Sequence, residues 1–514
     1  MYGLLQFILL IVSLILSVIL GLYVYLTWHF DYWVKRKIPG PKPRVLCGTF
    51  PGTIDGKRNF IYDLDEIYRQ FKNKSNFVGV FMTRSPQIMI IDPELCKEIL
   101  ITNFKCFQEN ESSIRTDRIR EPISGSNPFV LPFDEWKVKR AEIVPGVTSS
   151  KIKGMFPIIN SICTKFKQYL KTGIQNGITT IDAKEVALKY TGDVVADLVW
   201  GIDADNLSTS QDVSQHKTSI YHMSKVMINQ NFHAFNYYFL ARIFPIIRRF
   251  YYVRFFPELT DRYFMKLSHS AVELRQAQKN NSRQDFLQYM VELKNKKNIS
   301  DTQLTAHNLT FLFDGFETSA TLISHCLLLL ARYPLAQQKL RQELQEHFAL
   351  HSSLNFDDLI KLPYLEQCVA ETLRIFTPLP FMAKVCTQPC EFANNDGVSL
   401  QIQPGDICLI SLHSMHHDEE FFPQPEEFMP ERFAEEHGGT KKYKDMGVYL
   451  PFGDGPRICL GMKFALTQAK AAIVEVIKHF ELTVNERTRK DNYQSADSFM
   501  SGLDGGIFLD VKEL

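Results

Sequence analysis

The first thirty residues of the chain contain no aspartate, glutamate, lysine or arginine. Leucine, isoleucine and valine dominate this run, and about 20 apolar residues are enough for a helix to cross the hydrocarbon core of a bilayer. Trp28 lies near its end, where an amphipathic ring favours the interface, and the basic triplet Lys35-Arg36-Lys37 follows. A cleaved signal peptide fits poorly, because its basic region would come first. We predict a membrane anchor over residues 1–30, with the remaining chain on the cytosolic side.

A short proline-rich stretch follows the predicted anchor. Pro39, Pro41 and Pro43 cannot continue a helix and favour a stiff, extended chain. We predict a basic and proline-rich hinge over residues 31–45. No second linker, repeat or charge block follows, so residues 46–514 are expected to form one large domain.

Composition narrows the class of protein. The formal net charge is +1, with 45% hydrophobic and 22% charged residues, so nothing favours binding to nucleic acid. The ten cysteines have no paired spacing. The nearest pair, Cys386 and Cys390, has neither a second pair nor a histidine at the spacing of a zinc site. We expect reduced thiols and a cytosolic environment for most of the chain.

The periodicity of apolar residues favours a mainly α fold with small β-sheets. Spacings of three and four residues predict long helices, the clearest at 155–172, 302–332, 335–349 and 462–477. Strand signals are few and short. We predict one hairpin that pairs 77–81 with 87–91, and another that pairs 399–402 with 407–410 around Pro404-Gly405.

One segment, 235–256, combines many aromatic residues with four arginines. Apolar rings with arginines can dip into a membrane surface while the charges meet headgroups. A core helix with a solvated basic face explains the same composition equally well. The sequence leaves both interpretations open.

The strongest chemical signal is an isolated cysteine in a glycine-rich turn, in the run Phe452-Gly453-Asp454-Gly455-Pro456-Arg457-Ile458-Cys459-Leu460-Gly461. Backbone amides of such a turn, together with the cation of Arg457, would stabilise the thiolate of Cys459 over the thiol. An anion is also favoured near the N-terminus of the helix expected over 462–477. A dinucleotide-binding loop is excluded, because Ile458 stands where the third glycine of GxGxxG would be.

The same ten residues resemble the haem-binding signature of cytochromes P450, F-x-x-G-x-R-x-C-x-G, at every fixed position. This resemblance implies the cytochrome P450 fold, a large helical haem domain behind one transmembrane helix. It implies that Cys459 is the axial ligand of the iron of haem b. By the same resemblance, Phe452, Gly453, Arg457 and Gly461 belong to the cofactor-binding loop.

A second stretch, Asp314-Gly315-Phe316-Glu317-Thr318-Ser319, is similar to the oxygen-binding helix of that family. A glycine inside a helix costs about 1 kcal/mol relative to alanine, so its presence needs a reason. The resemblance implies catalytic roles for Thr318, which would orient dioxygen and its waters, and for Glu317, which would feed protons. Asp314 departs from the pattern, because the family usually has a small residue there.

Three further positions are implied to bind the haem propionates. Trp136 and Arg140 stand in a W-x-x-x-R pattern, and both side chains can donate hydrogen bonds to a carboxylate. Lys384 stands where an arginine is common, so a point charge replaces a bidentate fork.

A salt-bridged triad beneath the haem is also implied. Glu371 and Arg374 are three residues apart and share a helix face, and Arg432 follows in Pro-Glu-Arg-Phe. The resemblance gives these three residues a scaffold role.

The resemblance covers essentially the whole chain and implies a microsomal monooxygenase, single-pass in the endoplasmic reticulum membrane. No flavin or nicotinamide fingerprint is present, so electrons would come from outside the chain. The resemblance implies that NADPH supplies them through NADPH–cytochrome P450 reductase, with cytochrome b5 as a further partner. A basic patch for that reductase, or simply solvated lysines, would comprise Lys137, Lys139, Lys441, Lys442 and Lys444.

Substrate class is constrained only broadly. The resemblance implies a pocket built from segments rich in Phe, Ile and Pro, which favours an apolar substrate; these are 107–133, 311–316, 379–383 and 499–503. The general likeness is to insect microsomal enzymes that oxidise hormones and foreign chemicals, and it favours xenobiotic metabolism.

Three alternatives remain open at this point. One is a haem-thiolate isomerase or dehydratase, although such relatives often lose the acid–threonine pair that Glu317 and Thr318 retain. Another is a membrane-tethered haem-binding protein without catalysis. A third is a lumenal protein, which would use glycosylation sites such as Asn110-Glu111-Ser112.

Overall fold

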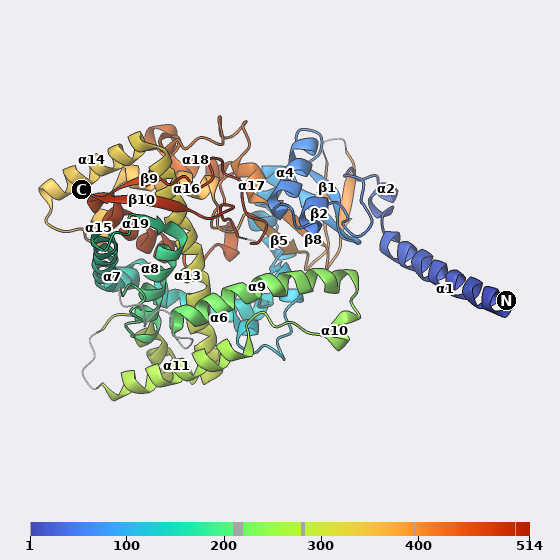
Figure 1. Ribbon diagram of the computed structural model, residues 1–514, viewed down its shortest axis with the longest axis horizontal. Helices are drawn as coiled ribbons and strands as arrows, with labels where there is room; N and C mark the ends of the chain where they lie inside the picture. The colour runs from blue at the N-terminus through green and yellow to red at the C-terminus, as the bar shows by residue number, and fades with distance from the viewer. Residues whose placement is uncertain (1, 209–218, 279–282, 395–396, 499) are drawn as a thin grey trace.

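The computed structural model describes residues 2–208, 219–278, 283–394, 397–498 and 500–514. One long helix, α1 (Tyr2–Thr27), projects away from a mainly helical body (Figure 1). It is the one helix in the described ranges that is long and apolar enough by itself to cross a membrane. The predicted class, mainly α with small β-sheets behind one N-terminal apolar helix, is confirmed.

Helices form most of the body, and the stretches predicted as helical fall inside α7, α13, α14 and α19. Beyond α1 the α-helices are α2 (Tyr32–Lys35), α3 (Pro51–Ile54), α4 (Phe60–Phe71), α5 (Pro93–Lys97), α6 (Phe133–Ile143), α7 (Ser149–Gln175), α8 (Ala183–Trp200), α9 (Ile220–Ile243), α10 (Ile247–Phe250), α11 (Glu258–Ala277), α12 (Phe286–Lys297), α13 (Asp301–Arg332), α14 (Pro334–Leu350), α15 (Phe356–Leu359), α16 (Pro363–Ile375), α17 (Leu412–His416), α18 (Gly439–Asp445) and α19 (Met462–His479).

The strands of the described residues form three small sheets. A five-stranded sheet has the order β1-β2-β8-β5-β3, a three-stranded sheet has the order β4-β10-β9, and β6 pairs with β7. The strands are β1 (Phe77–Met82), β2 (Ser85–Ile90), β3 (Glu109–Asn110), β4 (Thr180–Asp182), β5 (Phe381–Val385), β6 (Cys390–Ala393), β7 (Ser399–Ile402), β8 (Ile407–Ser411), β9 (Phe480–Val484) and β10 (Phe508–Glu513).

The first predicted hairpin is confirmed, because β1 and β2 pair antiparallel from Phe77↔Ile90 to Met82↔Ser85. The second prediction is wrong. β7 pairs with β6, whereas β8 pairs with β2 and β5. Gly405 and Cys386 explain the difference: the N–H of Gly405 donates to the carbonyl of Cys386, directly after β5, so the chain leaves β7 and enters the larger sheet. β8 is almost wholly buried there, as expected of a central strand.

The core is centred on α13, which runs through the body between α8 and α19 (Figure 1). A capping box between Ser300 and Gln303 begins this helix of 32 residues. Almost every residue from Leu304 to Ala331 is buried except around Asp314–Thr318. Each large apolar side chain buried in this way stabilises the fold by about 1.5–3 kcal/mol. The exception places a polar, accessible stretch at the middle of the most buried helix.

The stretch predicted as a hinge is attached to the sheet. Trp33 is buried and donates from Nε1 to the carbonyl of Val80 (3.1 Å). The N–H of Gly79 donates to the carbonyl of Pro39 (2.8 Å), and Ile38 is also buried. This part of the chain therefore lies along β1, and the boundaries 1–30, 31–45 and 46–514 stay predictions.

Candidate active site

Cys459 lies in a tight turn between the core and the start of α19. Its N–H donates to the carbonyl of Phe452 (2.9 Å), which closes the turn. Gly453 and Gly455 both have positive φ, +69° and +68°, a region that glycine enters without strain. A Cβ on Gly455 would also lie 1.9 Å from the carbonyl oxygen of Leu100. Glycine is therefore required at 455 by both conformation and contact.

The thiol of Cys459 is accessible, unlike the other nine cysteines of the chain, which are buried or half-buried. Desolvation by the surrounding protein nevertheless raises the pKa of the thiol to about 11, and the negative charge of Asp314 contributes. The N–H groups of Gly461 and Met462 and the charge of Arg140 act in the opposite direction. The donors stand at the N-terminus of α19, where an anionic sulfur is favoured.

Arg140 is the cation beside the sulfur, on α6. Its Nη1 donates to the carbonyl of Ile458 (3.0 Å), next to Cys459. The sequence assigned this charge effect to Arg457. In the structure the guanidinium of Arg457 instead donates to three carbonyls, and it lies 4.4 Å from the ring of buried Trp136; the three acceptors are Gln108, Pro128 and Leu131.

Lys384 lies on β5 and is almost completely buried. Its Nζ donates to the Oδ1 of Asn110 (2.9 Å). Burial, and then the positive charge of Arg457, lower the pKa of Lys384 to about 7. Burial also lowers the pKa of Arg457 to about 10, and Arg140 contributes while Glu109 opposes. Three cations thus repel one another across a water-poor region, which favours an anionic ligand.

The middle of α13 faces Cys459 through Asp314, whose charge acts on the thiol. Desolvation by the surrounding protein raises the pKa of Asp314 to about 7, although its side chain belongs to the accessible stretch of α13. The hydroxyl of Thr318 donates to the carbonyl of Asp314. Nearby, the Nε2 of Gln468 donates to the carbonyl of Gly315 (3.0 Å) and to the hydroxyl of Ser319. Side chains therefore hold the backbone of this helix at the stretch that the sequence singled out.

Glu317 faces a lysine that the sequence did not reveal. The Nζ of Lys184, on α8, lies 3.9 Å from the Oε1 of Glu317 and donates to its backbone carbonyl (3.3 Å). Burial raises the pKa of Glu317, and Lys184 acts against this shift. Burial likewise lowers the pKa of Lys184. The two side chains form a loose ion pair, in which each charge opposes the effect of desolvation on the other.

The structure thus adds two residues to the predicted site, Gln468 and Lys184. Gln468 could have been found, since it lies four residues after Phe464 and shares the buried face of α19. Lys184 carries no local signal, because α8 and α13 meet only in the folded chain.

The predicted triad is confirmed. Arg374 donates to Glu371 through Nε and Nη2, both at 2.8 Å, and Arg432 donates through Nε at 3.1 Å. The side chains of Glu371 and Arg374 have no solvent exposure. Arg374 also donates to the carbonyl of His416 (2.8 Å), which ties α16 to α17. This is a scaffold of fully paired charges.

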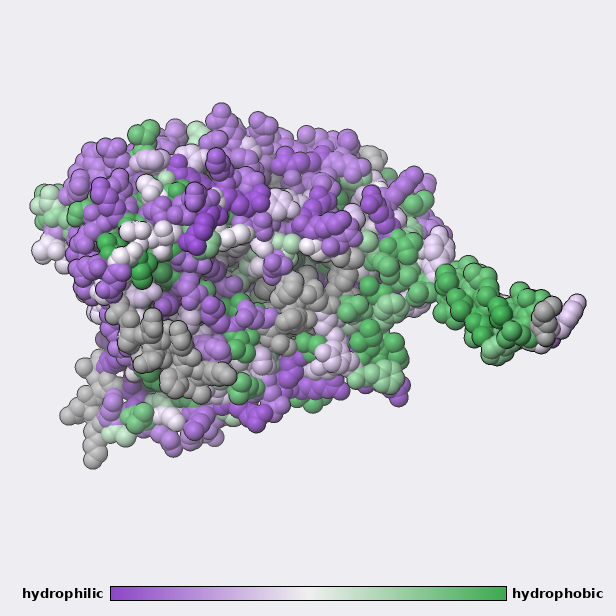
Figure 2. All heavy atoms as spheres, viewed as in Figure 1, coloured by the Kyte–Doolittle hydropathy of each residue, from purple (hydrophilic) through white to green (hydrophobic). Residues whose placement is uncertain are grey.

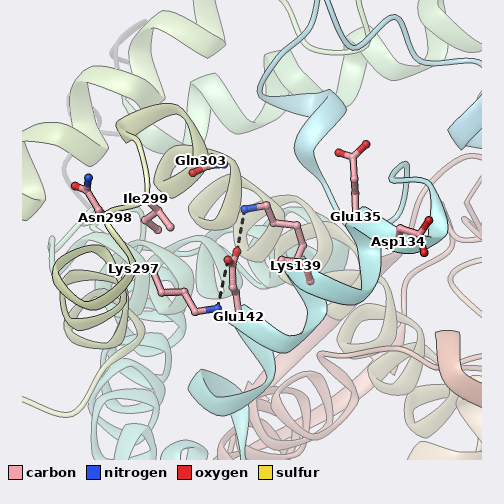
Figure 3. A pocket seen from close by; sticks show the side chains of 9 residues that line it. Asp134, Glu135, Lys139, Glu142, Lys297, Asn298, Ile299 and Gln303 are labelled. Carbon is pink, nitrogen blue, oxygen red and sulfur yellow. Dashed lines mark hydrogen bonds and ion pairs between the residues drawn. The ribbon is translucent and has the colours of Figure 1, made fainter.

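A groove of about 650 Å³ flanks α6 at the junction of α12 and α13. Figure 3 shows Glu142 reaching toward Lys139 and Lys297 across it, at 2.8 and 3.6 Å. A hydrogen bond from buried His307, and then one from Lys139, hold the pKa of Glu142 below its usual value. Lys139 is therefore engaged inside this groove, which removes it from the predicted basic patch.

The predicted pocket segments are mostly described, but Phe499 lies outside the described residues. The rings of Phe313 and Phe256 meet edge to face, with centroids 5.4 Å apart. The ring centroids of Phe311 and Phe464 are 4.7 Å apart. Phe311 and Phe313 of α13 therefore pack against aromatic neighbours.

The residues present fit a flat, anionic iron cofactor. A Cβ on Gly461 would meet nothing within 4 Å, and its φ of −86° suits any residue, so no protein neighbour requires glycine there. Close approach of a planar group beside Cys459 supplies a reason. A metal cation would also deprotonate the thiol despite its raised pKa. The crowded cations Arg140, Arg457 and Lys384 suit carboxylate groups.

Comparison with known proteins gives one answer for the whole chain. A family model described as Cytochrome P450 matches residues 38–505.

The chain belongs to the cytochrome P450 family. "Probable cytochrome P450 28d1" of Drosophila melanogaster is 41% identical over 502 residues, covering 97% of this chain and 98% of that protein. "Probable cytochrome P450 28a5" of the same fly is 41% identical over 513 residues, covering 98% and 100%. "Cytochrome P450 9e2" of Blattella germanica is 28% identical over 529 residues, covering 96% of each.

These relatives confirm the predicted likeness to insect cytochromes P450. As a P450 the chain is a monooxygenase, and membership implies haem iron, a redox partner and an apolar substrate. The helix α1 is compatible with a membrane anchor, as in microsomal P450s.

Proposed function

We propose that this P450 is a membrane-anchored monooxygenase of the endoplasmic reticulum that inserts one atom of dioxygen into apolar organic substrates, foreign chemicals first among them. The observation that carries the proposal is the placement of Cys459. Its sulfur lies at the N-terminus of α19 and faces the acid-bearing middle of α13. When bound, haem b supplies dioxygen activation and oxygen transfer, and a thiolate ligand favours O–O cleavage.

The protein's own residues hold the cofactor and set the charge of its ligand. The amides of Gly461 and Met462 and the cation of Arg140 stabilise the anionic form of Cys459. Propionate carboxylates would be held by cations and donors on α6, β5 and the cysteine loop; these are Trp136, Arg140, Lys384 and Arg457. Phe452 and Gly453 shape the loop beneath.

Proton supply falls to Glu317 and Thr318. Because burial raises the pKa of Glu317, its carboxyl keeps a proton closer to neutral pH than an exposed glutamate does. Lys184 lies within reach and limits that shift. The hydroxyl of Thr318 is fixed by the carbonyl of Asp314 and can accept a further hydrogen bond. Group and geometry suit general acid chemistry at one face of the pocket.

Electrons would come from NADPH through NADPH–cytochrome P450 reductase, with cytochrome b5 as an additional donor. Lys137 and Lys442 are exposed and Lys444 is half-exposed, which suits an acidic flavoprotein surface. Lys441 is paired with Asp445 in the same region. The anchor over residues 1–30, with the catalytic domain on the cytosolic side, would bring the two enzymes to one membrane.

A carbon monoxide difference spectrum of the reduced protein tests the ligand. Wild type is expected to give a long-wavelength Soret band, and Cys459→Ala to lose it. Cys47→Ala, a half-exposed cysteine far along the chain, is the matched control and should keep the band. A folded wild type without the band, or a Cys459→Ala protein that retains it, would contradict the proposal.

Substrate-dependent NADPH consumption, measured with reductase in membranes, tests the reaction. A monooxygenase consumes NADPH and dioxygen in step with product. Turnover of a hydroperoxide without NADPH would favour an isomerase or dehydratase, and haem binding without any turnover would favour a non-catalytic protein.

A further inference from the structure

The inward side of α4 begins at a buried asparagine. Asn59, the N-cap residue, is only 3% exposed and accepts from the N–H of Ile61 (3.1 Å) through Oδ1. The outward side of the same helix is polar, with Glu66, Arg69 and Gln70 exposed, and Figure 2 shows a mainly polar surface over this part of the body. Asn59 therefore makes its contacts inside the protein.

Two stretches near the C-terminus, 494–498 and 500–503, form what we call the C-terminal hairpin. An antiparallel bridge joins its two ends. The N–H of Ser495 also donates to the carbonyl of Gly502 (2.8 Å), so a shift of one arm moves the other. The second arm belongs to the segment 499–503, which is expected to line the substrate pocket.

Asn59 holds the first arm of this hairpin. Its Nδ2 donates to the carbonyls of Ser495 (2.7 Å) and Ser498 (2.8 Å). Beside it, the hydroxyl of Tyr62 accepts from the N–H of Gln494 (2.7 Å). All three bonds go to backbone groups, so the first turn of α4 fixes the course of the arm whatever side chains the arm carries.

The carboxamide of Asn59 uses one acceptor and two donor bonds at once. Serine, threonine and aspartate are also good N-cap residues, but none of their side chains can accept from Ile61 and donate to two carbonyls. Water cannot readily replace these bonds, because the residue is buried. Capping alone does not explain asparagine at this position, whereas holding the hairpin does.

The second arm of the hairpin is fixed to the residues that lead into β5. The N–H of Ser501 donates to the carbonyl of Pro378 (3.1 Å), and its hydroxyl donates to the carbonyl of Thr377. β5 in turn lies against the cysteine loop, since a Cβ on Gly453 would be 3.7 Å from the Sδ of Met382. The hairpin is thus tied to α4 on one side and to a strand of the candidate active site on the other.

Phe60, the next residue of α4, contacts β5 directly. Its ring meets that of Phe381 edge to face, with centroids 5.1 Å apart. Phe381 belongs to the segment 379–383, which is also expected to line the pocket. Two neighbouring residues of α4 therefore touch two pocket segments, the hairpin through Asn59 and β5 through Phe60.

We propose that Asn59 is a positioning residue that sets the width of the substrate pocket between the C-terminal hairpin and β5, and so determines which apolar substrates fit. The inference rests on the proposed haem-thiolate function and gives Asn59 no contact with substrate or cofactor. Asn59 acts through the backbone of the hairpin, which it holds at a fixed distance from α4 and therefore from Phe381.

Asn59→Ser separates the two roles of the side chain. Serine keeps a cap for α4 and loses the two amide donors. Asn355→Ser is the matched control, because Asn355 caps α15 through Oδ1 at an exposed position. The probes are N-methylimidazole, N-butylimidazole and N-octylimidazole, whose ring nitrogen binds haem iron while the alkyl chain extends into the pocket. Their dissociation constants are read from difference spectra of the full-length protein in membranes.

The methyl probe should bind Asn59→Ser as it binds wild type, and the octyl probe should bind about fivefold or more weakly, which is the effect of one hydrogen bond of ordinary strength. Asn355→Ser should match wild type with every probe. Ser501→Ala, which loses the hydroxyl that reaches Thr377, should also weaken binding of the octyl probe. An equal change for all three probes in Asn59→Ser, or no change for any, would overturn the proposal, as would octyl binding in Ser501→Ala equal to wild type.

Hydrogen exchange gives a readout that needs no haem. The amides of Ser495 and Ser501 should exchange faster in Asn59→Ser than in wild type or Asn355→Ser, because both belong to the hairpin. Unchanged exchange would overturn the proposal whatever the spectra show. A normal carbon monoxide spectrum with an unchanged probe series contradicts only this inference. A missing Soret band contradicts the proposed function, and the exchange rates then decide whether Asn59 positions the hairpin.

Discussion

The triad of Glu371, Arg374 and Arg432 and the middle of α13 both contain charged side chains, but the two regions hold them differently. In the triad, Glu371 accepts from two arginines at 2.8–3.1 Å, and the remaining donors of Arg374 reach carbonyls. In α13, Asp314 and Glu317 have raised pKa values because desolvation of their carboxyl groups is opposed weakly or not at all. The paired charges of the triad form a scaffold. The carboxyl groups with raised pKa values can instead bind and release protons near neutral pH.

The largest effect is expected in the triad. Glu371→Gln removes the one carboxylate from two buried arginines, so the free energy of unfolding should fall by about 3–5 kcal/mol, with loss of the Soret band. Glu431→Gln breaks an exposed ion pair with Lys339 and should cost at most about 1 kcal/mol. Chemical denaturation measures both. Similar losses of stability in the two variants would contradict the structural role given to the buried triad.

Glu317→Gln should reduce activity and leave stability nearly unchanged, in contrast to Glu371→Gln. Glutamine keeps the shape but cannot carry the proton, so product formation should fall by about 10-fold or more. Stability should change little, since the glutamate makes no close ion pair. The measurement is product formed per NADPH consumed, with denaturation in parallel. Unaltered turnover would show that the carboxyl group of Glu317 has no part in the reaction.

The variant Lys184→Met tests whether this lysine of α8 affects the pKa of Glu317. Because Lys184 lowers the pKa of Glu317, its loss should raise this pKa further. The protonated form then persists to higher pH, and the pH profile of turnover should shift upward by about one unit. Lys189→Met, on the same helix, is the control. A profile that shifts equally in both variants, or in neither, would leave Lys184 with a purely structural role.

Asp314→Asn should change how stability depends on pH, and the change has a defined sign. The pKa of Asp314 is raised to about 7, so between pH about 4 and about 7 the unfolded chain loses this proton while the folded chain keeps it. The contribution of Asp314 to stability therefore falls as pH rises through that window. The variant should melt like wild type near pH 4 and at a higher temperature near pH 8. Asp497→Asn, at an exposed position, should show no such divergence.

Elements that depend on local pattern could be predicted from the residues alone. The apolar run gave α1, the three- and four-residue spacing gave α7, α13, α14 and α19, and ten consecutive residues around Cys459 were enough to indicate the family. The triad was also predictable, because Glu371 and Arg374 share one turn of a helix. Each of these rests on contacts within a few residues or on a motif.

The tertiary structure alone decided which distant groups meet. β8 does not pair with β7, because the N–H of Gly405, in the turn between the two strands, donates to the carbonyl of Cys386. Arg140, and not Arg457, became the cation beside Cys459 because Arg457 reached three carbonyls of a segment more than three hundred residues earlier. Lys184 met Glu317 only where α8 crosses α13. Burial and long-range contacts determine the partners and the pKa values of these charged groups. Neither can be predicted from the spacing of residues along the chain.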